Sequence, residues 1–370
     1  MFFYSFLSRH AILVKMKVRA PGRICLFGEH QDYFGLSVIA MAINRELTIA
    51  YKPITGSEFV IHMPDLGEKE KIPLQPNLLY TKQRDYLRAG VNIFQRRGYH
   101  FNQAYEFTLT STIPLQAGCS SSSAMCVAWA KTLAEMTDHP EKENREFLAQ
   151  IAFEMEVLEF KEPGGMMDHY ASSFGNLISI NFEKSTPQYK VFDKVKLDGL
   201  ILGDSQQKKE TLDVLSKNKR AVLDALKFLE KKIPGFTLQS GTIEKIEPFK
   251  KSIEQDSFNR LEATLINRDI TRCAYDFFSK NKFTQEEVGS LLNQQHQAIR
   301  DLLKHSTPKI DTLMDASLHA GALGGKVNGS GGGGTFIVYA PHKEQKAISA
   351  IESKGGKAFL IQKAPGVSSA

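Results

Sequence analysis

The chain has 370 residues, of which 42% are hydrophobic and 24% charged, a composition typical of a soluble globular protein and long enough for two domains. The formal net charge of +6 is spread along the chain. Its densest parts, Lys227–Lys232 and Lys250–Lys251, show no repeated alternation of basic and aromatic residues, which favours a solvated helical face over a nucleic-acid interface.

The N-terminal segment and the cysteines bear on location. MFFYSFLSRHAILV is apolar, but Arg9 and His10 interrupt it, and it is too short for a membrane span and lacks the basic start of a signal peptide. Met16 begins a strand-like MKVRAPGR, which indicates that residues 1–15 are an upstream extension. The four cysteines show no C-x-x-C spacing, so we expect free thiols and a cytoplasmic protein without a membrane anchor.

The first half alternates strand and helix patterns. Strands are expected at Val18 into Ala20, Val38–Ala42, Leu47–Tyr51, Phe59–His62, Tyr105–Thr110 and Leu177–Asn181. Helices are expected from Thr81 to about Arg97, from the small-residue loop Gln116–Ala124 through about Met136, and over Asn144–Phe160.

The second half is rich in Lys and Gln. It predicts helices at about 209–232, 242–266, 284–304 and 309–320, a Gly-rich loop at Leu323–Gly334, a strand at Thr335–Ala340 and a closing helix–strand pair. The change near Thr186 predicts two domains, 16–185 and 186–370, and the mixed order indicates the α+β class.

Two loops of small residues suit phosphate binding. Gly118 and the run Ser120–Ser123 enter a helix, whose N-terminus offers unpaired N–H groups and partial positive charge, although a Ser-rich cap or linker would look the same. No Gly-Lys-Ser/Thr closes this loop, so it is not of the Walker type. The second loop, Lys326–Gly334, brings glycines between a helix and a strand, where a close approach of backbone to ligand competes with a flexible turn.

Polar groups in APGRICLFGEHQDYFG suit a ligand rich in hydroxyls. Arg23, Glu29, His30, Asp32 and Tyr33 combine carboxylate acceptors with donors around a glycine-bounded turn, although each of them alone would read as a solvated surface residue.

Asp168 follows Pro163-Gly164-Gly165 at the start of a helix. It could accept a proton from a substrate hydroxyl, but its spacing alone favours a helix N-cap.

Together these segments resemble the GHMP kinases, in their galactokinase-like branch. APGRICLFGEHQDYFG resembles the galactokinase-type signature, Pro114–Ala124 the Ser-rich loop, GGMMDHYASS at Gly164–Ser173 the segment with the catalytic aspartate, and Lys326–Gly334 the third motif. The resemblance implies a ribosomal-S5-like N-terminal domain, a ferredoxin-like C-terminal domain and an ATP-dependent sugar kinase, acting on the anomeric hydroxyl of galactose or a related sugar.

Site residues are carried over position by position. The resemblance implies Asp168 as general base, Arg23 as its stabiliser, and Glu29, His30, Asp32 and Tyr33 as sugar contacts. For ATP and Mg²⁺ it implies Gly118, Ser120, Ser121, Ser122, Ser123, Gly329, Gly331 and Gly332, with Ser122 and Glu156 as metal ligands. The expected partners are the sugar and ATP, with no nucleic acid or membrane, and the chain as a monomer or homodimer.

Several residues depart from the family pattern. Gln31, Phe34, Cys119 and Ser123 replace the usual residues of their motifs, and His169-Tyr170 replaces Gln-Phe. Phe34 and the His169-Tyr170 pair stand where they could touch the substrate, so uronic acids, pentoses and N-acetylhexosamines stay open as substrates. A mevalonate-type kinase is disfavoured because Glu29 and Asp32 would repel an anionic substrate. A non-catalytic sugar sensor is disfavoured because the chain has Asp168 and Arg23, and a protein that only binds a sugar has no need of a base.

Overall fold

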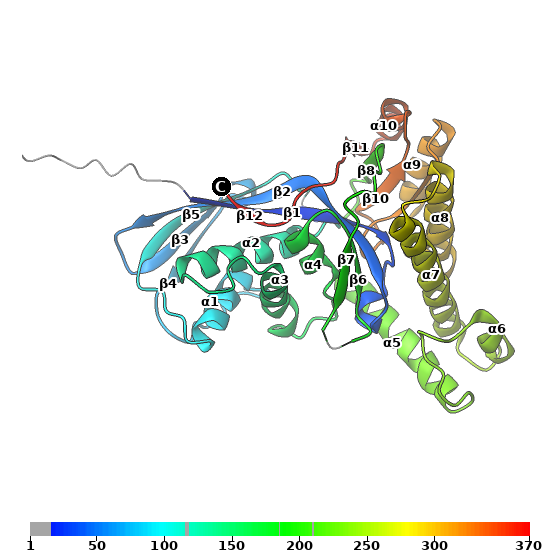
Figure 1. Ribbon diagram of the computed structural model, residues 1–370, viewed down its shortest axis with the longest axis horizontal. Coiled ribbons are helices and arrows are strands. Elements are labelled where there is room, and N and C mark those ends of the chain that lie inside the picture. The colour runs from blue at the N-terminus through cyan, green and yellow to red at the C-terminus, as the bar shows by residue number, and fades with distance from the viewer. Residues whose placement is uncertain (1–15, 115–117, 185, 209–210) are drawn as a thin grey trace, which may run out of the picture.

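The computed structural model describes residues 16–114, 118–184, 186–208 and 211–370. It is elongated and contains two mostly antiparallel sheets, of which the first is the larger and the second lies toward the end that carries the helices α7 (Gln255–Lys280) and α8 (Gln285–Gln297) (Figure 1). The strands of the first sheet are β1 (Met16–Phe27), β2 (Val38–Ile54), β3 (Glu58–Met63), β4 (Glu68–Pro73), β5 (Ala104–Ser111), β6 (Leu177–Asn181), β7 (Gln188–Val191) and β12 (Ser368–Ser369). The mixed α and β prediction is confirmed.

The long strand β2 organises the first sheet. The order is β12-β1-β2-β5-β3-β4, with β6 added on β2 and β7 on β6. The first part of β2 pairs with β6 and its last part with β5, so the strand changes partner around Asn44–Glu46. This exchange explains why one strand shows the polar interruption that predicted two strands.

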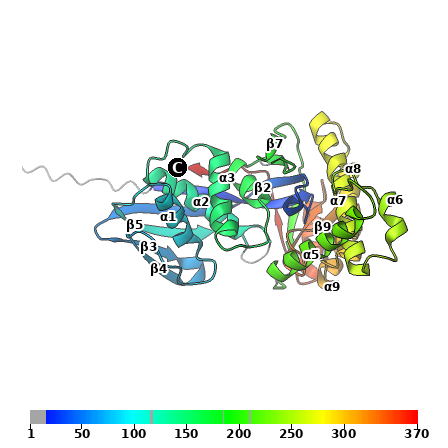
Figure 2. The same cartoon turned by 90° about the horizontal axis from the view of Figure 1, so that it is seen from below.

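Four helices cover one face of this sheet (Figure 2). They are α1 (Tyr86–Arg96), α2 (Ser121–Met136), α3 (Arg145–Phe153), extended by the π-helical turn η3 (Glu154–Leu158), and α4 (Met167–Phe174). Trp129 of α2 is fully buried, with its ring edge-on to Phe107 at 5.0 Å and to Phe59 at 6.3 Å. This aromatic cluster fixes α2 on the sheet and therefore fixes where its N-terminus lies.

The second half joins a smaller sheet to long helices. The antiparallel order β11-β8-β10-β9 is formed by β8 (Leu200–Asp204), β9 (Gly324–Val327), β10 (Thr335–Tyr339) and β11 (Lys357–Leu360). The helices are α5 (Thr211–Glu230), α6 (Ile243–Ile246), α7 (Gln255–Lys280), α8 (Gln285–Gln297) with the π-helical turn η5 (Ala298–Leu302), α9 (Pro308–His319) and α10 (Glu344–Ser353). Within the described residues, no helix is long and apolar enough to cross a membrane.

Some element boundaries differ from the sequence predictions. The helix expected from Thr81 begins at Tyr86, because Arg84 takes φ +60° and the Asp85 carboxylate accepts hydrogen bonds from Thr81. The helix expected at 242–266 is interrupted, and α7 starts anew where Glu254 caps it and then runs on to Lys280. The charged strand β4 was not predicted.

The C-terminal segment returns to the first sheet. After β11, Pro365 bridges to Gly175 and β12 pairs with β1, as Figure 1 shows beside the label of the C-terminus. The strand β7 also pairs into this sheet through β6. The division of domains at residue 186 stays a prediction, and these two strands beyond it belong to the first sheet.

Gly366 allows this return. A Cβ atom at Gly366 would stand 2.1 Å from both the Ser173 carbonyl oxygen and an Arg145 nitrogen. We predict that Gly366→Ala lowers the free energy of unfolding by about 1–3 kcal/mol, the usual cost of overpacking. Urea unfolding would measure it, with the exposed Ser368→Ala on the same segment as control. Equal midpoints for the two variants would contradict this close packing.

Candidate active site

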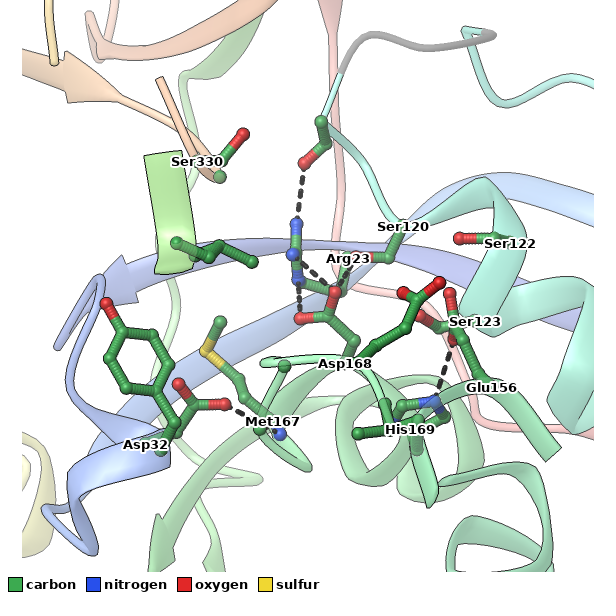
Figure 3. Close-up of a pocket in the computed structure, with 18 of the residues that line it drawn as sticks. Arg23, Asp32, Ser120, Ser122, Ser123, Glu156, Met167, Asp168, His169 and Ser330 are labelled. Atoms are coloured by element: carbon green, nitrogen blue, oxygen red, sulfur yellow. Dashed lines mark hydrogen bonds and ion pairs between the residues drawn. The ribbon is translucent and has the colours of Figure 1, made fainter. Parts of the chain in front are cut away.

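A cleft of about 650 Å³ opens between the two halves of the molecule, where the first strand, the start of α2 and the start of α4 meet (Figure 3). Its lining includes Arg23, Glu29, His30, Asp32, Tyr33, Arg84, Gly118, Ser120–Ser123, Glu156, Glu162, Gly164, Gly165, Asp168, His169, Leu215, Gly329 and Ser330. Residues far apart in the sequence therefore share one cavity.

An ion pair between Arg23 and Asp168 lies at the centre of the cleft. Arg23 follows a bulge in β1, and its Nε and Nη2 donate to the two carboxylate oxygens of Asp168 at 2.6 and 2.7 Å. Burial opposes ionisation of Asp168, but the charge and hydrogen bonds of Arg23, with the Ser120 hydroxyl, outweigh it and hold the pKa of Asp168 below its usual value. The carboxylate therefore carries its charge at neutral pH.

Asp168 is the second residue of α4, after the cap position Met166. Its carboxylate bonds to Arg23 and Ser120, which belong to other segments, and not to the first turn of its own helix. The N-cap role favoured by its spacing is therefore wrong.

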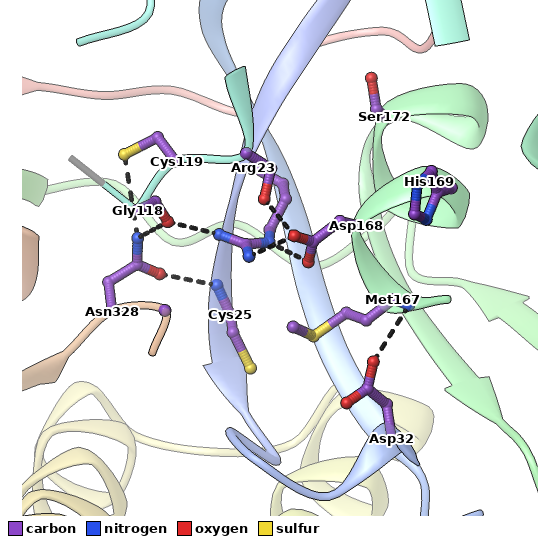
Figure 4. A network of polar contacts seen from close by, with 12 residues as sticks. Arg23, Cys25, Asp32, Gly118, Cys119, Met167, Asp168, His169, Ser172 and Asn328 are labelled. Carbon is purple, nitrogen blue, oxygen red and sulfur yellow. Dashed lines mark hydrogen bonds and ion pairs between the residues drawn. The ribbon is translucent and has the colours of Figure 1, made fainter. Parts of the chain in front are cut away.

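The Ser-rich loop presents the N-terminus of α2 to the cleft. Ser120, the cap residue, takes φ +57° and its hydroxyl donates to Asp168. Ser122 is exposed, whereas Ser123 is buried. The Gly118 carbonyl accepts hydrogen bonds from Arg23 at 2.7 Å and from Asn328 at 3.0 Å (Figure 4). Gln116 and Ala117, part of the predicted loop, lie outside the described residues.

Glu29 is held by groups of the second half. Its carboxylate binds the fully buried Lys326 at 2.7 Å and accepts the backbone N–H of Gly329 at 3.0 Å. Lys326 also donates to the Cys25 carbonyl at 2.8 Å. Glu29 thus joins the first motif to the third.

Asp32 has a different environment. Its carboxylate lies directly on Gly165, where a Cβ atom would stand 2.0 Å from it, and it accepts the Met167 backbone N–H at 3.3 Å. Burial and the neighbouring charge of Asp168 raise the pKa of Asp32 to about 6. Within the described residues no ion pair to Asp32 is formed, so its oxygens can accept hydrogen bonds from a ligand.

His30 and Tyr33 follow in the same turn. His30 Nδ1 lies 3.3 Å from the Tyr33 hydroxyl, and its Nε2 lies 3.2 Å from Nδ1 of His305. The Tyr33 hydroxyl also accepts from Asn218 of α5 at 2.7 Å. The turn is therefore packed against the helical half of the molecule.

Glu156 and His169 form a second buried pair beside α2, with His169 Nε2 2.8 Å from the Glu156 carboxylate (Figure 3). Burial opposes ionisation of Glu156, yet His169 and the hydroxyls of Ser122 and Ser123 keep the pKa of this carboxyl below its usual value. An ionised carboxylate beside an exposed serine hydroxyl is a hard oxygen donor set.

Of the sequence-predicted site residues, the structure brings all but two into the cleft lining. Gly331 and Gly332 lie instead against His305: the Gly332 N–H donates to the His305 carbonyl at 2.8 Å, and a Cβ atom at Gly331 would stand 2.3 Å from that oxygen. The sequence reasoning did not single out Asn328 and Lys326, although both belong to the quoted third motif. Their polar side chains inside a run of glycines were the available signal.

Arg84 and Glu162 were also missed. They pair across one end of the cleft at 2.5 and 3.0 Å. Nothing in the sequence around either residue marked it as part of a site.

Comparison with known proteins agrees with this geometry. The GHMP kinases N terminal domain matches residues 85–176, the GHMP kinases C terminal domain residues 281–357, and the galactokinase galactose-binding signature residues 11–53. A galactokinase of Thermotoga maritima is 30% identical, over 87% of this chain and 89% of its own. A mevalonate kinase of Pyrococcus furiosus is 25% identical, over 94% and 96%.

Among solved structures, Lactococcus lactis galactokinase complexed with galactose superposes with a TM-score of 0.83, covering 96% of this chain and 95% of its own at 19% identity. At that identity the superposition establishes the fold. With the matching family regions and the Thermotoga relative, it shows that the chain belongs to the GHMP kinase family, in its galactokinase-like branch, and is an ATP-dependent kinase of a sugar hydroxyl.

Proposed function

We propose that the chain transfers the γ-phosphoryl group of Mg·ATP to the anomeric hydroxyl of galactose or a closely related neutral sugar. One observation carries the proposal: five polar residues of the galactose-binding signature line the same cleft as Asp168 and the N-terminus of α2. They are Arg23, Glu29, His30, Asp32 and Tyr33.

The departures from the family pattern lie mostly away from this cleft. Phe34 packs edge-on to Tyr33 and against the apolar cluster of α5 and α7, and Tyr170 stacks on Phe174 in the core. Neither lines the cleft, so the expectation that they could touch the substrate is wrong. His169 does line it, but it bonds to Glu156. The substitutions therefore give little reason to prefer another sugar.

The charge of the cleft supports a neutral substrate. The two arginines of the described lining, Arg23 and Arg84, are each paired with a carboxylate through two hydrogen bonds. A substrate carboxylate would have to displace one of these pairs and would meet the charge of Asp32. This disfavours both a uronic acid and a mevalonate-type hydroxy acid.

In the proposed mechanism Asp168 is the general base and Arg23 orients it. Phosphoryl transfer has a loose transition state, so the acceptor hydroxyl becomes acidic late and a weak carboxylate base is sufficient. Arg23 holds Asp168 ionised and adds positive charge near the transferring oxygens. The N–H groups at the start of α2 would bind phosphate oxygens.

For the metal we propose Glu156 and the Ser122 hydroxyl. Within the described residues no group of three His, Cys, Asp or Glu could hold a metal ion. Mg²⁺ needs none, because it binds through one or two protein oxygens together with nucleotide phosphates and water. When bound, it would neutralise charge on the phosphates. Glu156, kept ionised by its neighbours, fits this role.

A cytoplasmic location remains part of the proposal, supported by the use of ATP and by four free thiols. The oligomeric state, monomer or homodimer, stays a prediction.

The substrate prediction is tested by ATP consumption with a panel of galactose, glucose, arabinose, N-acetylgalactosamine, galacturonate and mevalonate. We expect turnover with galactose and a kcat/KM at least tenfold lower for both acids. Binding of an acid would leave one carboxylate of the cleft or of the substrate without a paired cation, which costs more than about 1.4 kcal/mol. Preference for an acid would overturn the substrate proposal. Thermal stabilisation by sugars without any turnover would favour a sensor.

Asp168→Asn removes the base while keeping its shape. We expect kcat to fall by about 10²–10⁴-fold, the usual contribution of general base catalysis, with ATP affinity kept. Steady-state kinetics and calorimetric titration with ATP would measure the two effects. A thermal unfolding scan controls for the charge left on Arg23, and turnover close to wild type in a folded variant would remove Asp168 from this role.

Ser122→Ala tests the metal assignment. The variant should need several-fold more Mg²⁺ for half-maximal rate at saturating ATP, because one ligand of the ion is lost. Titration of the rate with MgCl₂ would show the shift, with Ser121→Ala as the neighbouring control for the Mg²⁺ midpoint. Identical midpoints in wild type and Ser122→Ala would discard the serine as a ligand.

A further inference from the structure

Behind the turn that carries His30 and Tyr33, five side chains form a closed ring of hydrogen bonds. Tyr33 and His30 belong to the turn, whereas Asn218 of α5, Arg260 of α7 and His305 after η5 belong to the helical half. Asn218, Arg260 and His305 are almost completely buried, and none of the three lines the cleft.

Arg260 sets the direction of every bond in this ring. A guanidinium group can only donate. Its Nη1 carries two hydrogens, and it has two acceptors at 3.2 Å, the Asn218 amide oxygen and Nε2 of His305. Its Nε donates to Asp256 at 2.8 Å. The amide orientation of Asn218 and the unprotonated Nε2 of His305 follow from these contacts.

The contact with Arg260 also determines which ring nitrogen is protonated in each of the two histidines. His305 has no hydrogen on Nε2, so its one N–H is on Nδ1 and donates to Nε2 of His30 at 3.2 Å. Burial and the charge of Arg260 lower the pKa of His305 to about 3, in agreement with a neutral ring. Nε2 of His30 is thereby an acceptor, and its hydrogen on Nδ1 points to the Tyr33 hydroxyl, 3.3 Å away.

The two sides of the ring, one through Asn218 and one through the histidines, therefore both donate a hydrogen bond to the Tyr33 hydroxyl oxygen. The Tyr33 hydroxyl accepts from His30 Nδ1 and from Asn218 Nδ2, which occupies both of its acceptor positions. Its own hydrogen has to point elsewhere, and Tyr33 lines the cleft. Burial raises the pKa of Tyr33 above its usual value, so this hydrogen is kept at neutral pH.

We propose that Asn218, Arg260 and His305 are positioning residues that turn the Tyr33 O–H into the cleft as a fixed donor to an oxygen of the sugar. The inference rests on the proposed function and deepens it. It adds a specificity element in which the second half of the molecule decides whether a residue of the first half donates or accepts. A substrate that offers only a C–H at this place would leave the phenol hydrogen unpaired.

Asn218→Asp reverses one bond of the ring without changing its shape. The introduced carboxylate can still accept from Arg260, but it has no hydrogen to give and would accept the Tyr33 hydrogen instead. We expect KM for galactose to rise about tenfold, the loss of one hydrogen bond, with KM for ATP and the kcat unchanged. Unchanged KM for galactose in a folded variant would overturn the proposal.

A double-mutant cycle with Tyr33→Phe separates positioning from general damage. Tyr33→Phe should raise KM to a similar extent, and adding Asn218→Asp to it should cause no further rise, because there is no hydroxyl left to turn. Additive effects, or parallel losses in KM for ATP and in thermal stability, would show a merely structural role and overturn the proposal.

The tautomers can be measured without any substrate. In ¹⁵N-labelled full-length protein, long-range ¹H–¹⁵N correlation spectra should show His30 and His305 both protonated on Nδ1, with His305→Gln used for assignment. An Nε2–H form of either ring would overturn the ring. Both tautomers as expected in a protein that phosphorylates no sugar would support the ring and count against the proposed function alone.

Discussion

A buried ion pair between Glu29 and Lys326 is the interaction on which the cleft depends. The Lys326 side chain is fully buried and that of Glu29 is 3% exposed, so each charge lacks the solvation it had in the unfolded chain. The pair is compensated by further hydrogen bonds to the Gly329 N–H and the Cys25 carbonyl. Removing one partner of such a pair costs about 3–5 kcal/mol, because the other charge stays buried. The two halves are therefore held together at Glu29, which directly precedes His30 in the cleft lining.

Two carboxyl groups of the cleft, Asp168 and Asp32, have pKa values that are shifted in opposite directions. Asp168 is held ionised by Arg23, whereas burial and the nearby charge of Asp168 raise the pKa of Asp32 to about 6. Two carboxyl groups whose pKa values are separated by their surroundings commonly take different roles in a site. Here the difference in pKa fits the proposal that Asp168 receives a proton and that Asp32 accepts a hydrogen bond from a sugar hydroxyl.

The sequence predicted the residues of the site better than it predicted the contacts between segments that form the fold. The positions of Arg23, Asp32 and Asp168 in one cleft followed from a motif resemblance, because each motif fixes a short segment of backbone. The buried roles of Lys326 and Asn328 did not, since they depend on which loops meet across the two halves. In the same way β2 could not be recognised as one strand, because its polar middle is explained by a change of partner strands that local periodicity does not contain.

The return of the C-terminal segment to the first sheet has a consequence for synthesis. The backbone N–H of Ala370 donates to the Lys17 carbonyl at 2.9 Å, so Ala370 lies beside the second residue that the structure describes. A ribosome releases the chain from the N-terminus, and the first half can begin to fold early. The edge of β1 that β12 covers stays unpaired until β12 is made, because β12 follows all the other strands of the described chain.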